Sequence, residues 1–128
     1  MAKAKDIMTK NVVLIKPDTS VYDAIIILVD KQISGMPVVN DKNELVGVVT
    51  EQDFLVYFDF VGNSEVKKAL VKDYMTRETV QFKPDSDVSE ILRAFVQKNI
   101  KRVPITNEND EVVGVVSRRD VLKYMANK

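Results

Sequence analysis

Hydrophobic and polar positions along the chain follow a pattern that occurs twice. Short β-prone segments at 12–15 and 79–82 each end at Lys-Pro, which predicts brief strands stopped by proline. Apolar residues at helical spacing follow each segment and predict helices over 21–32 and 88–99. The expected buried faces of these helices are Val21, Ala24, Ile25 and Leu28 in the first, and Val88, Ile91, Leu92 and Phe95 in the second.

A hairpin and a last helix complete each half. Two apolar segments flank a polar turn, DKNE in the first half and ENDE in the second. The second segments, LVGVVT and VVGVVS, are apolar at nearly every position, so we expect these strands to be buried on both faces. The last helix begins after Thr50 and after Ser117. The pattern of each half is therefore β-α-β-β-α, which predicts an α+β fold.

The two halves are copies of one unit. When residues 6–58 are placed over 73–125, a constant offset of 67 positions gives 21 identical pairs in 53 without a gap. We expect repeat 1 at 1–60, a helical linker at 61–72 and repeat 2 at 73–128. One repeat alone is too small to be comfortably stable, so the two repeats should pack as one module.

Composition narrows the class of protein. The chain has no cysteine and no histidine, which removes the commonest metal ligands and the commonest general base. We therefore expect no metal site, no catalytic residues and no enzymatic activity. Lys and Arg balance Asp and Glu at 19 each, which argues against a nucleic-acid partner. With no secretion signal and no apolar run long enough for a membrane span, we expect a cytoplasmic protein with no membrane partner.

Four polar pairs have the spacing of capping boxes. Ser20 with Asp23 and Asp87 with Glu90 stand at the start of the first helix of each half. Thr50-x-x-Asp53 and Ser117-x-x-Asp120 stand at the start of the last helix. Spacing alone favours a purely structural cap for the last two pairs, because an N-cap hydroxyl and an acid three residues later satisfy free backbone N–H groups.

Three motifs occur in the same order in both halves and resemble those of a known protein family. DIMT and DYMT, MPVV and VPIT, and GVVTEQD and GVVSRRD, repeated at constant spacing, resemble a stand-alone pair of CBS domains, also called a Bateman module. The resemblance implies two repeats around a pseudo-twofold axis, with clefts between them that bind an adenosine nucleotide, AMP or ATP, or an S-adenosylmethionine-like compound. It implies no tightly bound cofactor. It also implies a regulatory module that acts on a separate effector protein.

The family pattern assigns roles to particular residues. The two aspartates would accept hydrogen bonds from the ribose hydroxyls, and the hydroxyl residue three positions earlier would contact ribose or phosphate. A basic pair before Pro104 and a basic residue before the second aspartate would reach the phosphates, and an isoleucine in each repeat would line the base. The residues concerned are Thr50, Asp53, Ser117 and Asp120; Lys101, Arg102 and Arg119; and Ile33 and Ile100.

The two repeats differ where phosphate would lie. Repeat 1 has Ser34-Gly35 and Glu51-Gln52 at the positions where repeat 2 has Lys101-Arg102 and Arg118-Arg119. Arginine suits phosphate oxygens, whereas a glutamate repels them. We therefore expect one cleft to bind much more tightly than the other. The alternative for the basic residues is that they are solvated surface charges.

The helix EQDFLVYFDFV carries four of the nine aromatic residues of the chain, Phe54, Tyr57, Phe58 and Phe60. We expect a helix this apolar to pack in the core or to form the interface through which two modules dimerise. The family habit favours a homodimer through the helices at 51–61 and 118–126. The alternative to nucleotide sensing is a protein–protein interaction or oligomerisation module without nucleotide binding.

Overall fold

A computed structural model describes residues 2–61 and 68–127, and the side chains of Phe60 and Val61 lie outside this description. The chain forms two compact units. Unit 1 consists of Met1–Val12 with Val80–Lys128, and unit 2 consists of Val13–Thr79. The units differ from the sequence repeats, because each takes the first segment of the other repeat.

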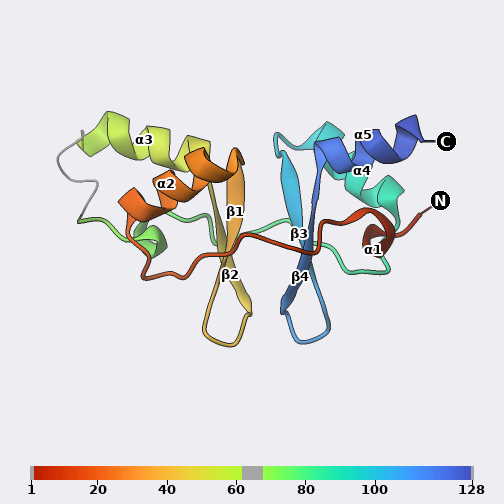
Figure 1. Cartoon of the computed structure of the whole chain (residues 1–128), viewed down its shortest axis with the longest axis horizontal. Helices are drawn as coiled ribbons and strands as arrows, with labels where there is room; N and C mark the ends of the chain where they lie inside the picture. Colours follow the sequence, from red (N-terminus) through yellow and green to blue (C-terminus); the bar gives the residue numbers. More distant parts are fainter. Residues whose placement is uncertain (1, 62–67, 128) are drawn as a thin grey trace. The chain divides into compact units, whose positions relative to one another are not determined.

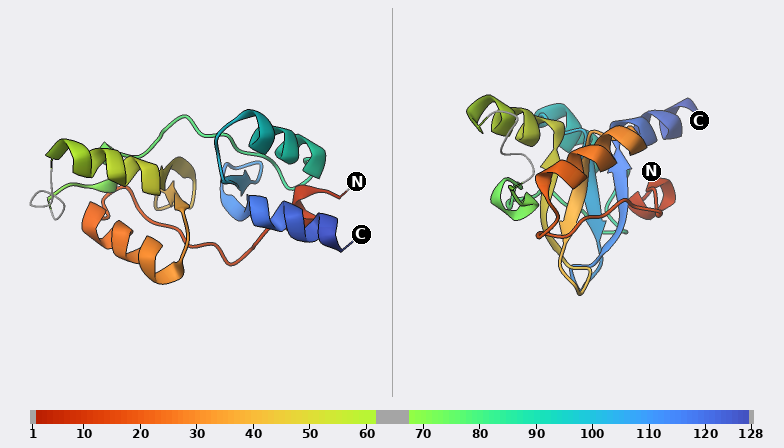
Figure 2. Two further views of the ribbon diagram at one scale, coloured as in Figure 1. Left: turned by 90° about the horizontal axis from the view of Figure 1, so that it is seen from above. Right: turned by 60° about the vertical axis from the view of Figure 1, so that its left-hand side comes forward.

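Unit 2 is a two-stranded hairpin covered by helices (Figure 1). Its elements are α2 (Val21–Lys31), β1 (Gly35–Val39), β2 (Leu45–Thr50), α3 (Glu51–Val61) and the 3-10 turn η2 (Val71–Asp73). β1 and β2 are antiparallel, and α2 packs beside α3 (Figure 2). Half of the predicted helical linker at 61–72, residues 62–67, lies outside the described residues, and its last two residues belong to η2.

Unit 1 repeats this plan with α4 (Val88–Gln97), β3 (Arg102–Thr106), β4 (Val112–Ser117) and α5 (Arg118–Ala126). The antiparallel strands β3 and β4 have the same register and the same irregularity as β1 and β2. A four-residue helix, α1 (Ala4–Ile7), is added from the N-terminal segment. The two repeats therefore fold alike, which confirms the α+β architecture of tandem β-α-β-β-α units.

The predicted first helices are confirmed, but only one has the expected cap. The Ser20 hydroxyl accepts a hydrogen bond from the Asp23 backbone N–H at 3.0 Å, and α2 ends at Gln32 in the left-handed region. The cap predicted at Asp87 is wrong, because its side chain makes no cap hydrogen bond. Its Oδ1 instead accepts from Lys3 Nζ at 2.6 Å. A cation from elsewhere in the chain has replaced the local partner.

Burial of the hairpins differs in detail from the prediction. β1 is buried at all five positions, whereas buried and half-buried residues alternate along β2. Strand β2 is therefore covered fully on one face only, whereas β4 is buried at four of its six positions. Leu92, predicted to face the core from α4, is 37% exposed, and Ala94 is buried instead. Val88, Ile91 and Phe95 are buried as predicted, so the α4 stripe keeps its position and takes in Ala94 on one side instead of Leu92 on the other.

The segments at 12–15 and 79–82 form less strand than predicted. Ile15 and Phe82 each make a single parallel bridge, to Val38 and Ile105 respectively. Each segment gives one backbone hydrogen bond to the hairpin and accepts one from it, and then ends at its proline. Proline has no N–H to donate, so the ladder stops there.

A second short segment lies against each hairpin from the opposite repeat. Thr76 exchanges two backbone hydrogen bonds with Val48 of β2, and Thr9 exchanges two with Val115 of β4. Glycine makes this approach possible. A Cβ at Gly47 would lie 2.9 Å from the Thr76 carbonyl oxygen, and one at Gly114 would lie 2.9 Å from Cγ of Met8. The DIMT and DYMT motifs are therefore crossing points between the repeats.

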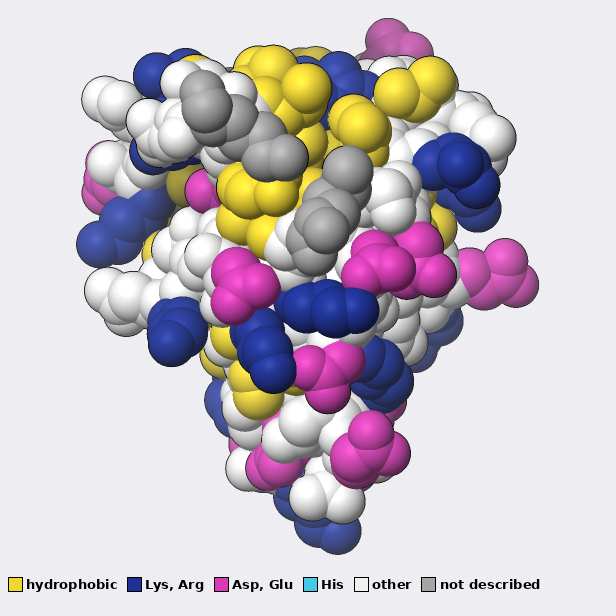
Figure 3. Space-filling model, turned by 90° about the vertical axis from the view of Figure 1, so that its right-hand side faces the viewer, with side chains coloured by type: hydrophobic (Ala, Val, Ile, Leu, Met, Phe, Trp, Pro, Cys, Tyr) yellow, Lys and Arg dark blue, Asp and Glu magenta, His cyan; other side chains and the backbone are white. Residues whose placement is uncertain are grey.

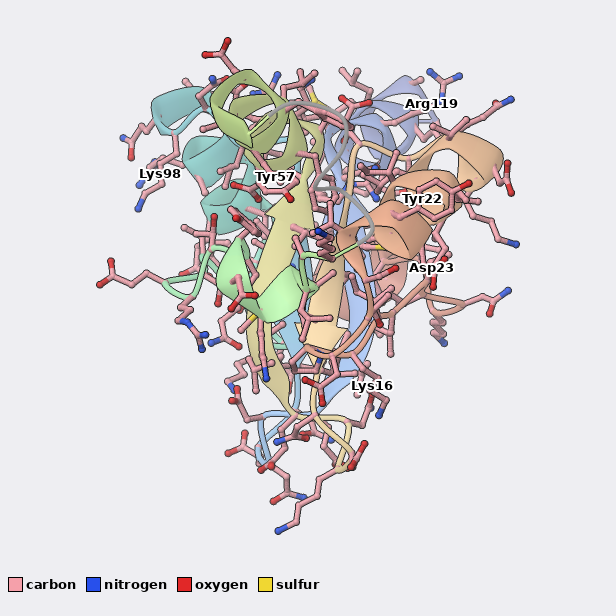
Figure 4. The ribbon with its side chains drawn as sticks, turned by 90° about the vertical axis from the view of Figure 1, so that its left-hand side faces the viewer. Lys16, Tyr22, Asp23, Tyr57, Lys98 and Arg119 are labelled. Atoms are coloured by element: carbon pink, nitrogen blue, oxygen red, sulfur yellow. The ribbon has the colours of Figure 1, made fainter. Side chains whose placement is uncertain are left out.

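The aromatic helix α3 serves the core of unit 2 with one face. Phe54 and Tyr57 are buried, and the ring of Tyr57 lies 4.2 Å from that of Tyr74 (Figure 4). Leu55 and Val56 on the other face are more than half exposed. The predicted core role is thus confirmed for one face of this helix, and the other face exposes apolar side chains. None of the helices in the described ranges is long and apolar enough to cross a membrane.

Candidate functional site

The start of α5 in unit 1 is organised around one carboxylate. Oδ2 of Asp120 accepts hydrogen bonds from the Ser117 backbone N–H at 2.8 Å and from its hydroxyl at 3.0 Å. The Ser117 hydroxyl accepts in return from the Asp120 backbone N–H at 3.2 Å. The capping box predicted here is confirmed, and it fixes the carboxylate at the end of β4.

The start of α3 in unit 2 repeats this arrangement with an addition. Oδ2 of Asp53 accepts from the Thr50 backbone N–H at 2.9 Å and from its hydroxyl at 3.2 Å. Oδ1 of Asp53 also accepts from the Thr76 hydroxyl at 3.4 Å. Both oxygens of this carboxylate therefore have partners within the protein.

The two aspartates differ in the oxygen that they leave available. Within the described part of the chain, nothing donates a hydrogen bond to Oδ1 of Asp120. The residue equivalent to Thr76 is Thr9, whose backbone bonds to Val115 but whose hydroxyl does not reach Asp120. An ionised carboxylate oxygen has room for two donors, so unit 1 presents a stronger acceptor.

Backbone N–H groups at the start of α5 are largely occupied. The Arg118 N–H donates to the Lys101 carbonyl at 3.0 Å, and that of Asp120 is used in the cap. In unit 2, Glu51 donates likewise to the Ser34 carbonyl at 2.9 Å. Of the first three backbone N–H groups of α5 and of α3, only that of the second residue remains available to a phosphate in the described part of the chain. Side chains must therefore make most of the contacts to any bound phosphate.

The predicted basic residues converge on the same end of unit 1. Arg102 opens β3 directly opposite Ser117, the last residue of β4. Lys101 precedes it and is joined to Arg118 by the backbone bond described above. Arg119, the second residue of α5, is exposed. These cations and the Asp120 carboxylate therefore belong to one corner of the hairpin, although they are separated by up to 19 positions in sequence.

Among the residues that the structure describes, the same corner of unit 2 has no such cations. Gly35 lies opposite Thr50, and Ser34 and Gln52 are uncharged. A side chain at Gly35 would lie 2.8 Å from the Val49 carbonyl oxygen, so this position has no room for the equivalent of Arg102 without a shift. With Glu51 at the first position of α3, the corner is acidic.

Ile33 and Ile100, predicted to line the base, are half-buried against the cores of units 2 and 1. The Ile100 carbonyl accepts from Arg118 Nε at 2.8 Å, which ties this segment to the start of α5. All nine predicted site residues thus fall into two groups. Unit 1 contains Ile100, Lys101, Arg102, Ser117, Arg119 and Asp120, and unit 2 contains Ile33, Thr50 and Asp53.

Sequence reasoning missed the Thr76 side chain as a partner of Asp53. It also missed the contact of each methionine, Met8 and Met75, with a strand glycine. The signal in the sequence is that the Met-Thr dipeptide and the strand glycine occur at the same spacing in both repeats. This spacing does not reveal that each Met-Thr dipeptide contacts the glycine of the other repeat, because it would be the same if each dipeptide contacted the glycine of its own repeat.

A family model named CBS domain matches residues 4–59 and 71–127. The chain belongs to the CBS-domain family. It is a tandem CBS pair. In each CBS repeat the strand glycine, the hydroxyl residue and the aspartate described above lie in the last strand and last helix.

Curated relatives place the CBS pair inside longer chains. Inosine-5′-monophosphate dehydrogenase from Methanocaldococcus jannaschii is 34% identical over 94% of this chain and 23% of its own length. The uncharacterized protein MJ1225 of the same organism is 28% identical over 96% of this chain and 42% of its own. The chain therefore spans less than half the length of these relatives, and the similarity to the dehydrogenase is confined to the CBS portion.

A solved CBS pair has the same fold along its whole length. The structure of CBSX2, a chloroplastic protein of Arabidopsis thaliana, was determined in complex with AMP. It is 28% identical to this chain, covers 99% of it with 98% of its own length, and superposes with a TM-score of 0.88. This chain is similar to an AMP-bound CBS pair from end to end.

Proposed function

We propose that this CBS pair is a regulatory module that binds an adenosine nucleotide at the basic corner of unit 1. The proposal rests on Oδ1 of Asp120, which is available to accept hydrogen bonds from a ligand. Three basic residues predicted to bind phosphate belong to the same corner. Asp120 would accept the ribose hydroxyls, and Lys101, Arg102 and Arg119 would bind the phosphates. Ile100 would contribute apolar contact to the base.

The chemistry of the corner suits a nucleotide. A ribose cis-diol presents two O–H donors, and a carboxylate accepts both in charge-assisted hydrogen bonds. Because the capping bonds hold Oδ2 of Asp120 in place, Oδ1 is oriented before a ligand arrives. Planar guanidinium groups bind phosphate oxygens through two parallel hydrogen bonds, and several cations together favour more than one phosphate.

AMP is the first ligand to test, since CBSX2 was solved with it and resembles this chain over its full length. ADP, ATP and S-adenosylmethionine share the adenosine portion and are the other candidates. The proposal contains no catalytic step. A bound nucleotide regulates only if it binds one conformation of the module more tightly than another, and a separate effector protein would respond to that difference.

Thermal unfolding with a panel of ligands tests the proposal. AMP, ADP, ATP, S-adenosylmethionine and NADH would be compared with guanosine nucleotides as controls. A ligand at a hundredfold excess over its Kd stabilises the folded state by about 2.7 kcal/mol. For a domain of this size the Tm should rise by roughly 8–15 °C. A rise with adenosine ligands alone supports the proposal, and no rise with any of them contradicts it.

The second candidate function is an interaction module without nucleotide binding. Exposed apolar residues on the helices favour it, and we propose self-association through α3 and α5 in either case. Leu55 and Leu122, at equivalent positions of the two repeats, are 63% and 65% exposed, and Met125 is 56% exposed. A monomer that shows a ligand-dependent Tm would contradict the self-association and leave nucleotide binding in place.

A further inference from the structure

The segment that leads from α4 into β3 is held differently from its counterpart in unit 2. α2 ends with Gln32 in the left-handed region, and the Gln32 and Ile33 amides both donate to the Leu28 carbonyl. α4 ends in extended backbone at Lys98, and the Ile100 amide donates to the Lys98 carbonyl at 2.8 Å, within the segment itself. Among the described residues, no backbone bond joins Ile100 to its own helix as one joins Ile33 to α2.

Arg118 attaches this segment to the start of α5 instead. Its backbone N–H donates to the Lys101 carbonyl at 3.0 Å, and its side-chain Nε donates to the Ile100 carbonyl at 2.8 Å. Glu51 occupies the equivalent position in unit 2 and keeps only the backbone bond, because an ionised carboxylate has no hydrogen to donate. In the described part of the chain, a side chain therefore holds this segment in unit 1 alone.

The partner of the Arg118 side chain differs from that of other cations on unit 1. Across the middle of the face of unit 1 shown in Figure 3, basic and acidic side chains lie side by side. Lys3, for example, pairs with Asp87 at 2.6 Å. Arg118 is bonded to a neutral carbonyl, and no acceptor within the described residues is bonded to its two Nη groups. The positive charge of this guanidinium is thus available to an anion.

The guanidinium group can bind the carbonyl and a phosphate at the same time. It presents five N–H donors in one plane, of which Nε supplies one and the two Nη groups supply four. With Nε on the Ile100 carbonyl, the Nη groups can still form two parallel hydrogen bonds to phosphate oxygens. Arg118 also belongs to the proposed nucleotide corner, since it follows Ser117, which lies opposite Arg102 and forms the cap with Asp120.

We infer that Arg118 couples phosphate binding to the position of the segment that lines the base. The inference rests on the proposed nucleotide binding and adds to it a positioning residue. While Nε holds the Ile100 carbonyl, the guanidinium is already oriented, so a phosphate binds it with a smaller loss of side-chain freedom. Thermodynamic linkage requires the converse, that a bound phosphate strengthens the hold on Ile100 by the same factor. A nucleotide is thereby distinguished from a nucleoside by more than its phosphate contact.

Calorimetric titration of AMP and of adenosine into variants of Arg118 tests the coupling. Arg118→Ala removes both side-chain interactions, so adenosine should bind about two- to fivefold more weakly and AMP at least about tenfold more weakly. Arg118→Lys keeps the charge but replaces the planar fork by a compact ammonium group, so it should restore only part of the AMP affinity.

Arg93→Ala is the matched control, because it removes the same side chain from an exposed position on α4 of the same unit. It should change neither affinity by more than about twofold, as expected for a solvated surface charge. Circular dichroism would show that each variant is folded.

The pattern of losses decides between the possible roles of Arg118. Losses for both ligands in Arg118→Ala, with the larger loss for AMP, support the coupling. A loss for AMP alone would mean that Arg118 binds phosphate without positioning Ile100, and equal losses would mean that it positions Ile100 without binding phosphate. Either result overturns the coupling, and so does full AMP affinity in Arg118→Lys, since charge alone would then be sufficient.

Amide hydrogen exchange provides a readout that a purely structural role would not change. The Ile100 amide, bonded to Lys98, and the Arg118 amide, bonded to Lys101, both report on the segment. In the wild type, saturating AMP should slow their exchange more than saturating adenosine, and this difference should disappear in Arg118→Ala. Equal protection by the two ligands in the wild type would contradict the coupling.

Failure of the coupling can be told apart from failure of nucleotide binding. A wild type that binds neither AMP nor adenosine overturns the proposed function, and the coupling with it, before any variant is made. A wild type that binds AMP, together with an Arg118→Ala variant that binds both ligands as the wild type does, overturns the coupling alone.

Discussion

At the scale of the residue, one carboxylate serves two purposes that use different oxygens. Oδ2 of Asp120 completes the cap of α5, and Oδ1 is available to a ligand. Asp53 has the same cap, but its Oδ1 already accepts from Thr76. The structural and functional interpretations of the Thr-x-x-Asp and Ser-x-x-Asp motifs are therefore compatible, and they can be separated by substitution.

Two substitutions of Asp120 should differ in stability. Asp120→Ala removes the capping acceptor and should lower the free energy of unfolding by about 1 kcal/mol. Asp120→Asn keeps one oxygen for the Ser117 N–H and presents an NH2 group at the other position, so it should cost less than half as much. Urea unfolding measures both. Equal losses would mean that the amide does not preserve the cap, and Asp120→Asn could not then be used to isolate ligand binding.

At the scale of the element, the N-terminal segment is held on unit 1 by a glycine contact and by charge. Met8 lies over Gly114, and the backbone N–H of Ala2 donates to the Tyr124 hydroxyl at 3.3 Å. Lys3 and Lys5 pair with Asp87 and Asp85. The segment belongs to repeat 1 in sequence but stabilises the unit formed by repeat 2.

Gly114→Ala should loosen this segment. The added Cβ would lie 2.5 Å from the sulfur of Met8, so the methionine must move from the strand. We expect the free energy of unfolding to fall by about 1–3 kcal/mol, as for other overpacked sites. We also expect faster hydrogen exchange at the Thr9 and Val115 amides. Gly35→Ala, where the neighbouring Val49 carbonyl lies on an adjacent strand, is the matched control, and it should leave exchange at Thr9 unchanged.

The ion pair between Lys3 and Asp87 should make stability depend on pH at both extremes. The hydrogen bond and charge of Lys3 lower the pKa of Asp87, so its contribution is present above its unfolded pKa and is lost as pH falls through the lower folded value. The Asp87 carboxylate raises the pKa of Lys3, so that contribution is lost as pH rises through the raised value. Between about pH 4 and pH 10 it should be constant.

Asp87→Asn tests this pH dependence. The variant should unfold at a slightly lower Tm than the wild type at pH 7, and the two should converge at about pH 2, where the carboxyl is protonated in both folded and unfolded chains. The effect should be small because both side chains are nearly half exposed and the pair is screened by solvent. A difference that persists unchanged at pH 2 would show that the ion pair is not its cause.

At the scale of the whole molecule, the sequence predicts the repeated unit better than the way the repeats combine. Hydrophobic periodicity, proline positions and the turns place α2, α4 and both hairpins correctly, because these depend on local pattern. The exchange of DIMT and DYMT between units is non-local, and the constant offset of 67 conceals it. The local spacing around Asp53 and Asp120 likewise predicts two equal caps. The difference between their Oδ1 atoms comes from a non-local contact, the hydrogen bond from Thr76 to Asp53.

The difference in phosphate binding between the repeats should follow the first two residues of their last helices. Replacing Arg118-Arg119 by Glu-Gln gives unit 1 the start of unit 2 and should weaken ATP binding more than adenosine binding. The loss for ATP should be at least about tenfold, since hydrogen bonds to charged partners contribute roughly 1.5–3 kcal/mol each. Calorimetry of both ligands with both chains measures this. Equal losses for ATP and adenosine would mean that these residues do not bind phosphate.

The central claim, that unit 1 binds an adenosine nucleotide through Asp120, is tested most directly by calorimetric titration of AMP into three chains. These are the wild type, Asp120→Asn and the matched variant Asp53→Asn of the other repeat, each shown by circular dichroism to be folded. The account predicts one tight site per chain in the wild type and in Asp53→Asn, and its loss in Asp120→Asn. Two equal sites in the wild type, or a tight site that survives Asp120→Asn and disappears in Asp53→Asn, would contradict it.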